Sequence, residues 1–484
     1  MQTTDESSLI EPGHTLTSVT SKIIEIPLTR IHKTPVGWIG GFFIAFLGMI
    51  VFLYAVTNLF IRGIGIWGNN IPVGWAWGIT NFVWWIGIGH AGTLISAILL
   101  LFRQQWRTSI NRFAEAMTLF AVANALMFPI LHLGRPWLFY TLIPYPNIFH
   151  LWPNFRSPLI WDVFAITTYF LVSFLFWYMG LVPDLSTLRD KAKNGLVRRI
   201  YGLMALGWRN SVRHWHHYQS VYFLMAVLAT PLVISVHSIV SVDFAYGIVP
   251  GWHSTIFPPY FVAGAVFSGF AMVLTLMIPL RQFFRLKDLI TQRHLDMMAK
   301  VMLAMGLVVG YGYIMEIFEG FYGADPYAIF NDIDRATGYY YLMFWALILI
   351  NIVITQFLWI KKVRTNPLLL FIIAFLINVG MWLERFLIIG QSLSKDYLPS
   401  AWHIFTPTIW DVLTFVGTLG VFLSLIFLFV RLLPAISVFE IRELVHHEAH
   451  SGGKETGSAA GTGSGGSGEP GEPAVPNQGF AAGK

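Results

Sequence analysis

The chain has 484 residues, of which 55% are hydrophobic and only 12% charged, and its mean hydropathy is +0.62. This number of charged side chains is too small to cover the surface of a soluble protein of this length. A soluble globular fold is therefore excluded. The net charge of +6 does not indicate nucleic-acid binding, because basic membrane-flanking loops explain it.

A transmembrane helix needs roughly 20 mostly apolar residues. The sequence contains ten such segments, which predicts an all-α polytopic membrane protein with about ten transmembrane helices. In chain order these spans cover residues 38–61, 74–102, 112–133, 158–182, 218–241, 257–280, 297–318, 337–360, 366–390 and 406–433.

The basic residues predict the orientation of the chain. Seventeen Lys and Arg residues flank the spans on one face and five on the other. Because basic short loops stay in the cytoplasm, we predict that both termini are cytoplasmic. Residues 1–34 form a polar N-terminal segment without a visible cleavable signal peptide, so the first span is the expected insertion signal.

The end of the chain differs in composition from the membrane domain predicted at residues 35–435. From Ser451 onward it consists mainly of Gly, Ser, Pro and Ala. Such a composition cannot build a packed core, so residues 436–484 are predicted to form a flexible cytoplasmic tail.

The chain contains no cysteine. Iron–sulfur clusters are normally held by Cys thiolates, and covalent c-type haem needs a Cys-x-x-Cys-His motif, so we expect neither here. Haem b would need paired histidines. His90 lies near the middle of the second span, His132 at the outer end of the third, and His237 at the end of the fifth. No two spans each carry two His about thirteen residues apart, the spacing expected for two stacked haems. The sequence therefore favours a chain without a metal centre.

Groups that can accept protons collect at the predicted outer ends of the spans. The third span ends at His132 and the fourth begins with Asp162, so the two should lie at similar depth on neighbouring helices. His237 and Asp243 follow on the same side. Intramembrane ionisable residues are functional candidates, and a patch of His and carboxylate can take protons from a bound hydroxyl group. The alternative is that His132 and Asp162 only pair with each other or cap helix ends.

Aromatic side chains accompany these residues and could line a site for a flat ring. They are Trp137, Phe139, Tyr140, Trp152 and Trp161. An interfacial aromatic belt would give the same pattern.

Residues 157–163, Ser-Pro-Leu-Ile-Trp-Asp-Val, recur as residues 406–412, Thr-Pro-Thr-Ile-Trp-Asp-Val. Each copy predicts Ser or Thr as the helix N-cap, Pro at the first helical position, and an Asp one turn inside the helix. These acids are Asp162 and Asp411. Spans 3 and 4 thus resemble spans 9 and 10 as a weak internal duplication.

The second half offers Glu384 and Arg385 where the first half has His132. An adjacent Arg and acid can form a buried structural pair, so we interpret them as scaffold or proton path rather than as a second active site. Glu316 allows both interpretations. Glu115, at the inner end of the third span, could belong to a proton entrance, but surface solvation is the simpler expectation.

Three motifs carry a resemblance to a known family. They are His-Leu-Gly-Arg-Pro at residues 132–136, Pro-x-Ile-Trp-Asp-Val at the start of span 4, and Gly-Ile-Gly-His-Ala-Gly-Thr at residues 87–93. Together with the span pattern, over about residues 35–435, they resemble the NrfD/polysulfide-reductase membrane subunits, which bind quinones without a prosthetic group of their own. Ten spans and a long tail resemble most closely the larger such subunit, ActC, of bacterial alternative complex III.

The resemblance implies a quinol site on the periplasmic side of a bacterial inner membrane. It implies c-type haem subunits, a second NrfD-like membrane subunit and an adjacent iron–sulfur subunit. The quinol-site bundle would cover about residues 74–241, a second bundle residues 257–390, and flanking spans residues 38–61 and 406–433. His132 and Asp162 match the family's quinol-site residues, Asp243 matches a further acid, His90 fits less closely, and Trp161 would line the site.

A quinol releases two electrons and two protons, and without a metal centre the electrons must leave through a partner. We expect His132 to accept one proton, Asp162 to bind or accept the other, and His237 and Asp243 to release protons outward. Further proton-path candidates are Glu316, Glu384, Arg385 and Asp411. The substrate would be menaquinol or ubiquinol, in a respiratory or photosynthetic complex, with proton translocation left open. Two alternatives are a proton or ion transporter using Asp162 and Asp411 and a passive membrane anchor.

Overall fold

The computed structural model describes residues 9–29, 34–142 and 158–446. Within these residues the regular secondary structure is helical, and ten helices are long and apolar enough to cross a membrane. The prediction of an all-α polytopic membrane protein is confirmed. The predictions for Trp152 and for the chain beyond residue 446 concern residues outside the described ranges.

Six of the spans are single helices and three are built from several helical pieces, while the fourth apolar span, Ile160–Lys191, lies within α7. The single helices are α2 (Val36–Arg62), α6 (Asn111–Leu131), α9 (Val212–Ala245), α10 (Phe257–Phe283), α11 (Gln292–Tyr322) and α17 (Ile409–Leu432), and α7 covers Pro158–Lys191. The composite spans are Trp77–Leu101 with α3 (Trp77–Ile88), α4 (His90–Thr93) and α5 (Leu99–Leu101), Tyr341–Trp359 with α13 (Tyr341–Ile348), and Pro367–Ser394 with α15 (Pro367–Phe386) and α16 (Ser392–Ser394). The shorter helices outside the spans are α1 (Leu16–Leu28), α8 (Gly195–Met204), α12 (Pro326–Thr337) and α14 (Lys361–Arg364).

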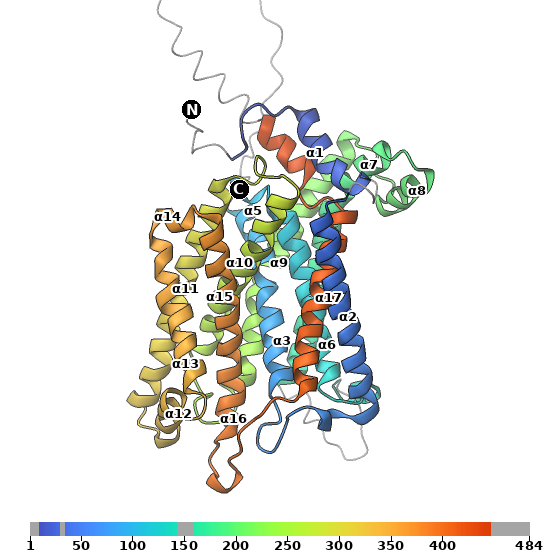
Figure 1. Ribbon diagram of the computed structural model, residues 1–484. Coiled ribbons are helices and arrows are strands. Elements are labelled where there is room, and N and C mark those ends of the chain that lie inside the picture. Colours follow the sequence, from blue (N-terminus) through green and yellow to red (C-terminus); the bar gives the residue numbers. More distant parts are fainter. Residues whose placement is uncertain (1–8, 30–33, 143–157, 447–484) are drawn as a thin grey trace, which may run out of the picture.

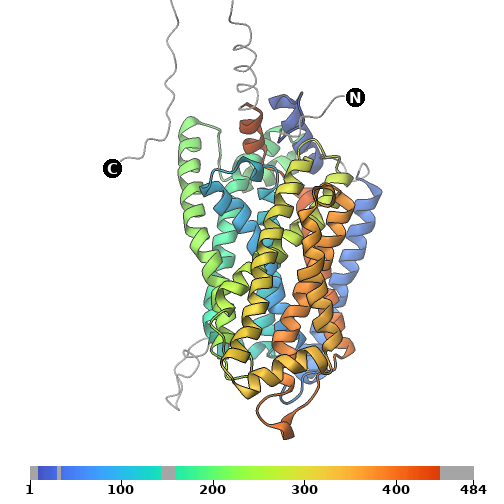
Figure 2. The ribbon, with the colours of Figure 1, turned by 90° about the vertical axis from the view of Figure 1, so that its left-hand side faces the viewer.

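The spans run side by side along the long axis of the molecule (Figure 1, Figure 2). Helix α1 and the last described residues lie at one end of the bundle, and α12 and α16 lie at the other (Figure 1). We call the end with α1 the inner face, which is the predicted cytoplasmic face, and the opposite end the outer face.

The helices pack in two groups that share α10. One group contains α3, α6, α7 and α9, and the other contains α10, α11, α13 and α15. Helix α10 also contacts α3 and α9, so the groups form one bundle. Helix α17 packs along α2 and contacts α6, and therefore lies beside the first group.

In the described part of the chain, three spans contain a π-helical segment, at Leu94–Ile98, Leu349–Ile354 and Leu387–Gln391. The first follows His90 by one turn and the third follows Arg385. Such segments disturb the regular hydrogen-bond ladder and are frequent at functional sites. The first and third segments thus lie next to the buried side chains of His90 and Arg385.

The beginning of the predicted tail is ordered. Residues 438–446 form a helical segment on the inner face, and Glu440 in it binds Asn111 and Arg107 of the membrane domain. The predicted start of a flexible tail at residue 436 is therefore too early, because this stretch is still rich in apolar residues.

Candidate functional site

Asp162 and Asp243 meet at the outer ends of α7 and α9. The two helices run antiparallel and pack along each other, so the start of α7 lies beside the end of α9. Both side chains are buried, and their carboxyl groups lie close enough to influence each other's charge. Among the described residues no donor reaches either carboxyl oxygen of Asp162. Two ionised carboxylates repel each other at close range, so binding of one proton by the pair is favoured.

His90 and His237 form a second buried pair further into the bundle. Their ring centroids are 4.5 Å apart at an interplanar angle of 64°. The Nδ1 of His90 lies 2.8 Å from the Ile86 carbonyl oxygen and donates to it, whereas both ring nitrogens of His237 lack a partner within the described residues. Because the rings touch, they cannot be the two axial ligands of a haem placed between them. Along α9, His237 and Asp243 are separated by about 9 Å.

The glycines around His90 explain why its span is interrupted. A Cβ atom on Gly92 would lie 2.1 Å from the Ala114 carbonyl oxygen, so only glycine lets α4 approach α6 this closely. At Gly89 the chain turns between α3 and α4, and its carbonyl accepts hydrogen bonds from Thr118 Oγ1 at 2.6 Å and the Tyr169 hydroxyl at 2.9 Å. These bonds satisfy a backbone group that the interrupted helix leaves open.

His132 is the C-cap residue of α6, at the outer end of this helix. Its Nδ1 lies 3.2 Å from the Phe128 carbonyl oxygen. Burial lowers the pKa of His132, so the ring is mostly neutral near pH 7 and can accept a proton. Helices α6 and α7 pack together, but within the described residues no hydrogen bond joins His132 to Asp162, whose carboxyl group faces Asp243 instead. Trp161, just before Asp162, is half-buried.

Arg385 and Glu384 adjoin the histidine pair. Phe261 lies between His237 and Arg385. The centroid of the Phe261 ring is 5.9 Å from the centroid of the His237 ring and 4.0 Å from Arg385 Cζ. Arg385 Nη1 is 2.7 Å from Glu384 Oε1. The two helix groups therefore share one buried polar region.

A small cavity of about 40 Å3 lies beside Glu384. Glu316, Asp332 and Arg335 also line it. Arg335 Nη1 lies 2.5 Å from Glu316 Oε1 and 3.8 Å from Asp332 Oδ1. Burial raises the pKa of Asp332 to about 7, against the opposing effect of Arg335. The cavity is too small for a quinone ring but has room for water molecules.

Asp411 has a structural role at the start of α17. Its Oδ2 accepts hydrogen bonds from the Thr408 amide at 2.8 Å, the Thr408 hydroxyl at 3.0 Å and the Gly68 amide at 2.9 Å. Thr408 and Asp411 form a capping box, and the helix begins at Ile409. The predicted N-cap at Thr406 is therefore two residues too early.

The two repeated aspartates are not equivalent in the structure. Helix α7 begins at Pro158, which makes Asp162 its fifth residue, whereas Asp411 is the third residue of α17. The predicted cap Ser157 lies outside the described residues. A side chain at the third helical position can bond back to the N-cap residue, as Asp411 does. A side chain at the fifth position lies too far along the helix to do so, which leaves Asp162 free to face a neighbouring helix.

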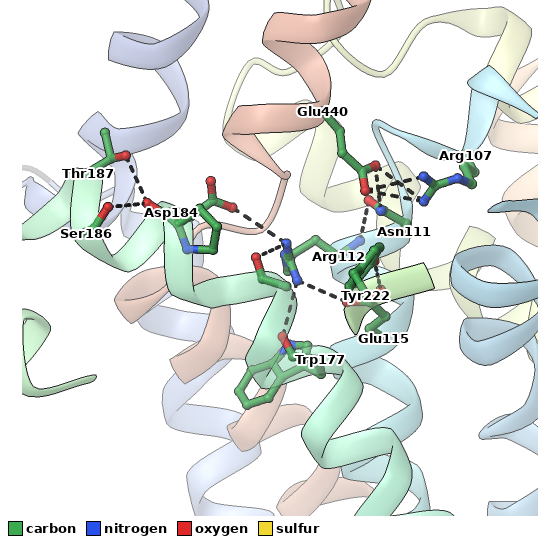
Figure 3. A network of polar contacts seen from close by, with 12 residues as sticks. Arg107, Asn111, Arg112, Glu115, Trp177, Asp184, Ser186, Thr187, Tyr222 and Glu440 are labelled. Carbon is green, nitrogen blue, oxygen red and sulfur yellow. Dashed lines mark hydrogen bonds and ion pairs between the residues drawn. The ribbon is translucent and has the colours of Figure 1, made fainter. Parts of the chain in front are cut away.

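A buried ionic cluster lies near the inner face (Figure 3). Arg112 is 0% exposed, and it lies between Glu115, at 3.2 Å, and Asp184, at 3.7 Å. The Tyr222 hydroxyl donates to Glu115 at 3.0 Å. The expectation that Glu115 is solvated at the surface is wrong, because Arg112 and Tyr222 enclose it. The spacing of Arg112 and Glu115, three residues apart on one helix, was the available signal.

The C-terminal segment completes this cluster. Glu440 lies 2.8 Å from Asn111 Nδ2 and 3.4 Å from Arg107 Nη1. Asp184 lines a cavity of about 610 Å3 between α7, α9 and residues 438–446. The cluster thus contains two arginines and three carboxyl groups, and it joins four segments that are distant in the sequence.

Residues 67–395 match the family model described as polysulphide reductase, NrfD. The chain belongs to this family. It is 26% identical over 238 residues to the membrane subunit of a putative dimethyl sulfoxide reductase of Halobacterium salinarum, covering 47% of this chain and 50% of the relative. It is 24% identical over 247 residues to a selenate reductase subunit of Mesobacillus selenatarsenatis, covering 48% and 54%. The chain thus spans about half the length of these two relatives.

A third relative matches the NrfD chain over most of its length. It is the Hdr-like menaquinol oxidoreductase integral membrane subunit of Archaeoglobus fulgidus, 22% identical over 437 residues, which cover 84% of this chain and 98% of the relative. The NrfD match includes Asp162, Asp243, His90 and His237 but excludes α17 with Asp411. The paired acids and histidines therefore belong to the part of the molecule that the family shares.

Proposed function

We propose that this NrfD-family chain is the quinol-binding membrane subunit of a multi-subunit oxidoreductase and that quinol is oxidised beside the Asp162–Asp243 pair. The observation that carries the proposal is this buried carboxyl pair, in which both oxygens of Asp162 and Oδ1 of Asp243 have no hydrogen-bond donor among the described residues. Burying two acids without hydrogen-bond donors costs free energy. A role as acceptor of the hydroxyl protons of a bound quinol explains why the pair is buried here. The name of the Archaeoglobus relative supports quinol as the substrate.

Oxidation of one quinol releases two protons and two electrons. Neutral His132 accepts one proton, and the carboxyl pair accepts the other and passes it outward through Asp243. The ring would lie against Trp161 and the aromatic residues near it. With no cysteine in the chain, the electrons pass to an iron–sulfur partner on the outer side and then to c-type haem subunits.

The remaining candidates fall into two groups. His237 lies about 9 Å from Asp243 along α9, and together with His90 it can relay protons. Glu384 and Glu316, which line the small outer cavity, and Arg385 beside Glu384 can do the same. Asp411 is left out of the proton path, because its Oδ2 is occupied by three donors at a helix start. We extend the proposal to an alternative-complex-III-type assembly with a second NrfD-like subunit, supported by the ten spans and the long tail.

The transporter alternative loses support from the geometry of Asp411. Alternating carriers would need two acids in comparable positions, and Asp162 and Asp411 differ in both helix position and partners. A passive anchor would have no use for a buried acid pair and a buried histidine pair. Transport by the chain alone would appear as ion flux in vesicles that contain only this protein.

The test is to purify the chain with the subunits that accompany it and to measure bound quinone, the visible redox spectrum and quinol turnover. Quinone should be present, and His132→Ala should reduce its retention. Asp190→Asn, a change at an exposed acid on the inner face, serves as the control. Quinone retained equally in both variants, or no quinone in the intact complex, would refute the proposed site.

A further inference from the structure

Helix α8 lies at the depth where the inner lipid headgroups begin. The Tyr178 hydroxyl of α7 donates to the Met204 carbonyl at 2.6 Å, and the Tyr201 hydroxyl of α8 donates to the Leu432 carbonyl at 2.9 Å. Leu432 is the last residue of the tenth span. Tyr178 follows the start of its span at Ile160 by roughly 27 Å of helix, close to the ~30 Å thickness of the hydrocarbon core. Two independent anchors therefore place α8 at the membrane edge.

One face of α8 carries an exposed apolar stripe. Leu196, Ile200 and Leu203 are 67%, 47% and 79% exposed. Their spacing of four and three residues puts them on one side of the helix, while Tyr201 on another side is buried against the bundle. Figure 1 shows α8 at the edge of the bundle, beside the inner end of α7. The stripe is therefore not covered by the described part of the protein.

Basic side chains surround the stripe. Six of them are exposed and form no ion pair within the described part of the chain: Lys191, Lys193, Arg198, Arg199, Arg209 and Arg213. The only acid between residues 186 and 217 is Asp190, and Arg189 already binds it at 2.8 Å. The segment from residue 186 to residue 217 therefore carries a large excess of positive charge.

We propose that α8 is an interfacial helix whose apolar stripe enters the inner leaflet and whose basic neighbours bind the phosphate groups of anionic phospholipids. Charge complementarity and depth select the lipid surface as the occupant, since amphipathic basic helices bind membranes in this way. Helix α8 also joins α7 to α9, the two helices that bring Asp162 to Asp243. Lipid binding therefore fastens the inner ends of the helices that form the outer acid pair. The inference does not depend on the quinol proposal.

The absence of cysteine allows a direct test in the full-length chain. A polarity-sensitive fluorophore on Leu203→Cys, in lipid nanodiscs, should be quenched by nitroxide-labelled lipid and protected from aqueous iodide. The same label on Lys287→Cys, at an exposed position after α10 and outside the basic group around α8, should show the reverse. If iodide reaches both labels equally, the stripe lies in water and the proposal fails. The measurement is repeated with the co-purified subunits present. If neither quencher then reaches the label at residue 203, a partner protein covers the stripe, and the proposal also fails.

A second measurement tests lipid charge. Phosphatidylglycerol is titrated into phosphatidylcholine nanodiscs that contain the label at residue 203. The double change Arg198→Gln and Arg199→Gln should raise the phosphatidylglycerol content needed for a half-maximal fluorescence change by roughly ten-fold or more. The matched control removes two exposed charges after α10, Arg285→Gln and Lys287→Gln, and should leave the response unchanged. Equal losses in both variants, or no loss in either, would overturn the proposed phosphate binding.

Discussion

Replacing Arg112 with Met should strongly destabilise the membrane domain. The guanidinium contacts Glu115 at 3.2 Å and Asp184 at 3.7 Å, and it donates to the carbonyls of Gly180 at 2.6 Å and Trp177 at 3.2 Å. Met has a similar length but no donor, so two buried acids lose their counter-ion. Removing one partner from a buried ion pair costs about 3–5 kcal/mol, and the lost carbonyl bonds act in the same direction.

The free energy of unfolding can be measured by titration with a denaturing detergent. Adding Glu115→Gln to Arg112→Met should recover part of the loss, because one uncompensated charge disappears. The coupling between the two changes should be about 0.5–3 kcal/mol in a double-mutant cycle. Arg285→Met, at an exposed position on the same face, should stay within about 0.5 kcal/mol of the parent protein. If Arg112→Met costs no more than Arg285→Met, or if Glu115→Gln gives no recovery, the ion-pair reasoning is wrong.

Three further predictions concern separate parts of the molecule. The pKa of Asp332 is raised to about 7 in the folded chain, so between about pH 4 and 7 the folded state holds a proton that the unfolded state has released. The free energy of unfolding should therefore fall as the pH rises through this range. Asp332→Asn should remove this part of the decline, which is measured by comparing melting temperatures at pH 5 and pH 8. Asp411→Ala should cost about 0.5–2 kcal/mol of stability through loss of the helix cap while quinol turnover per assembled complex is retained, and a loss of turnover would return Asp411 to the proton path. Gly92→Ala should reduce the yield of folded protein, since its Cβ would lie 2.1 Å from a backbone oxygen, whereas Gly310→Ala, with open space around it, should be tolerated.

The membrane spans could be predicted from sequence because each needs a long apolar segment. The differences lie at the ends of the helices. Helix α7 continues to Lys191 and α9 begins at Val212, well beyond the predicted limits at residues 182 and 218. Hydropathy falls where a helix leaves the lipid, although the helix itself continues into the polar region. Helix α8 and the segment 438–446 could not be placed for the same reason.

The candidate residues could be named from sequence, but most of their partners could not. Asp162 was expected near His132, the neighbour along the chain, whereas its contact is with Asp243, 81 positions later. Which two helices face each other depends on tertiary packing, which a single sequence does not encode locally. The repeated motif suggested that Asp411 is equivalent to Asp162. A shift of two residues in the helix start turns the same acid into a cap.

The most direct test of the central claim is quinol turnover by the assembled complex carrying Asp162→Asn, Asp243→Asn or both. Asn keeps the volume of the side chain and can still hydrogen-bond the remaining acid, so assembly should be preserved. Each single change should reduce turnover by about 10²–10⁴-fold, as loss of a proton-accepting group does. The double change should add little, because the two carboxyl groups act as one unit. Normal turnover in the double variant, or losses that simply multiply, would contradict a shared proton-accepting site.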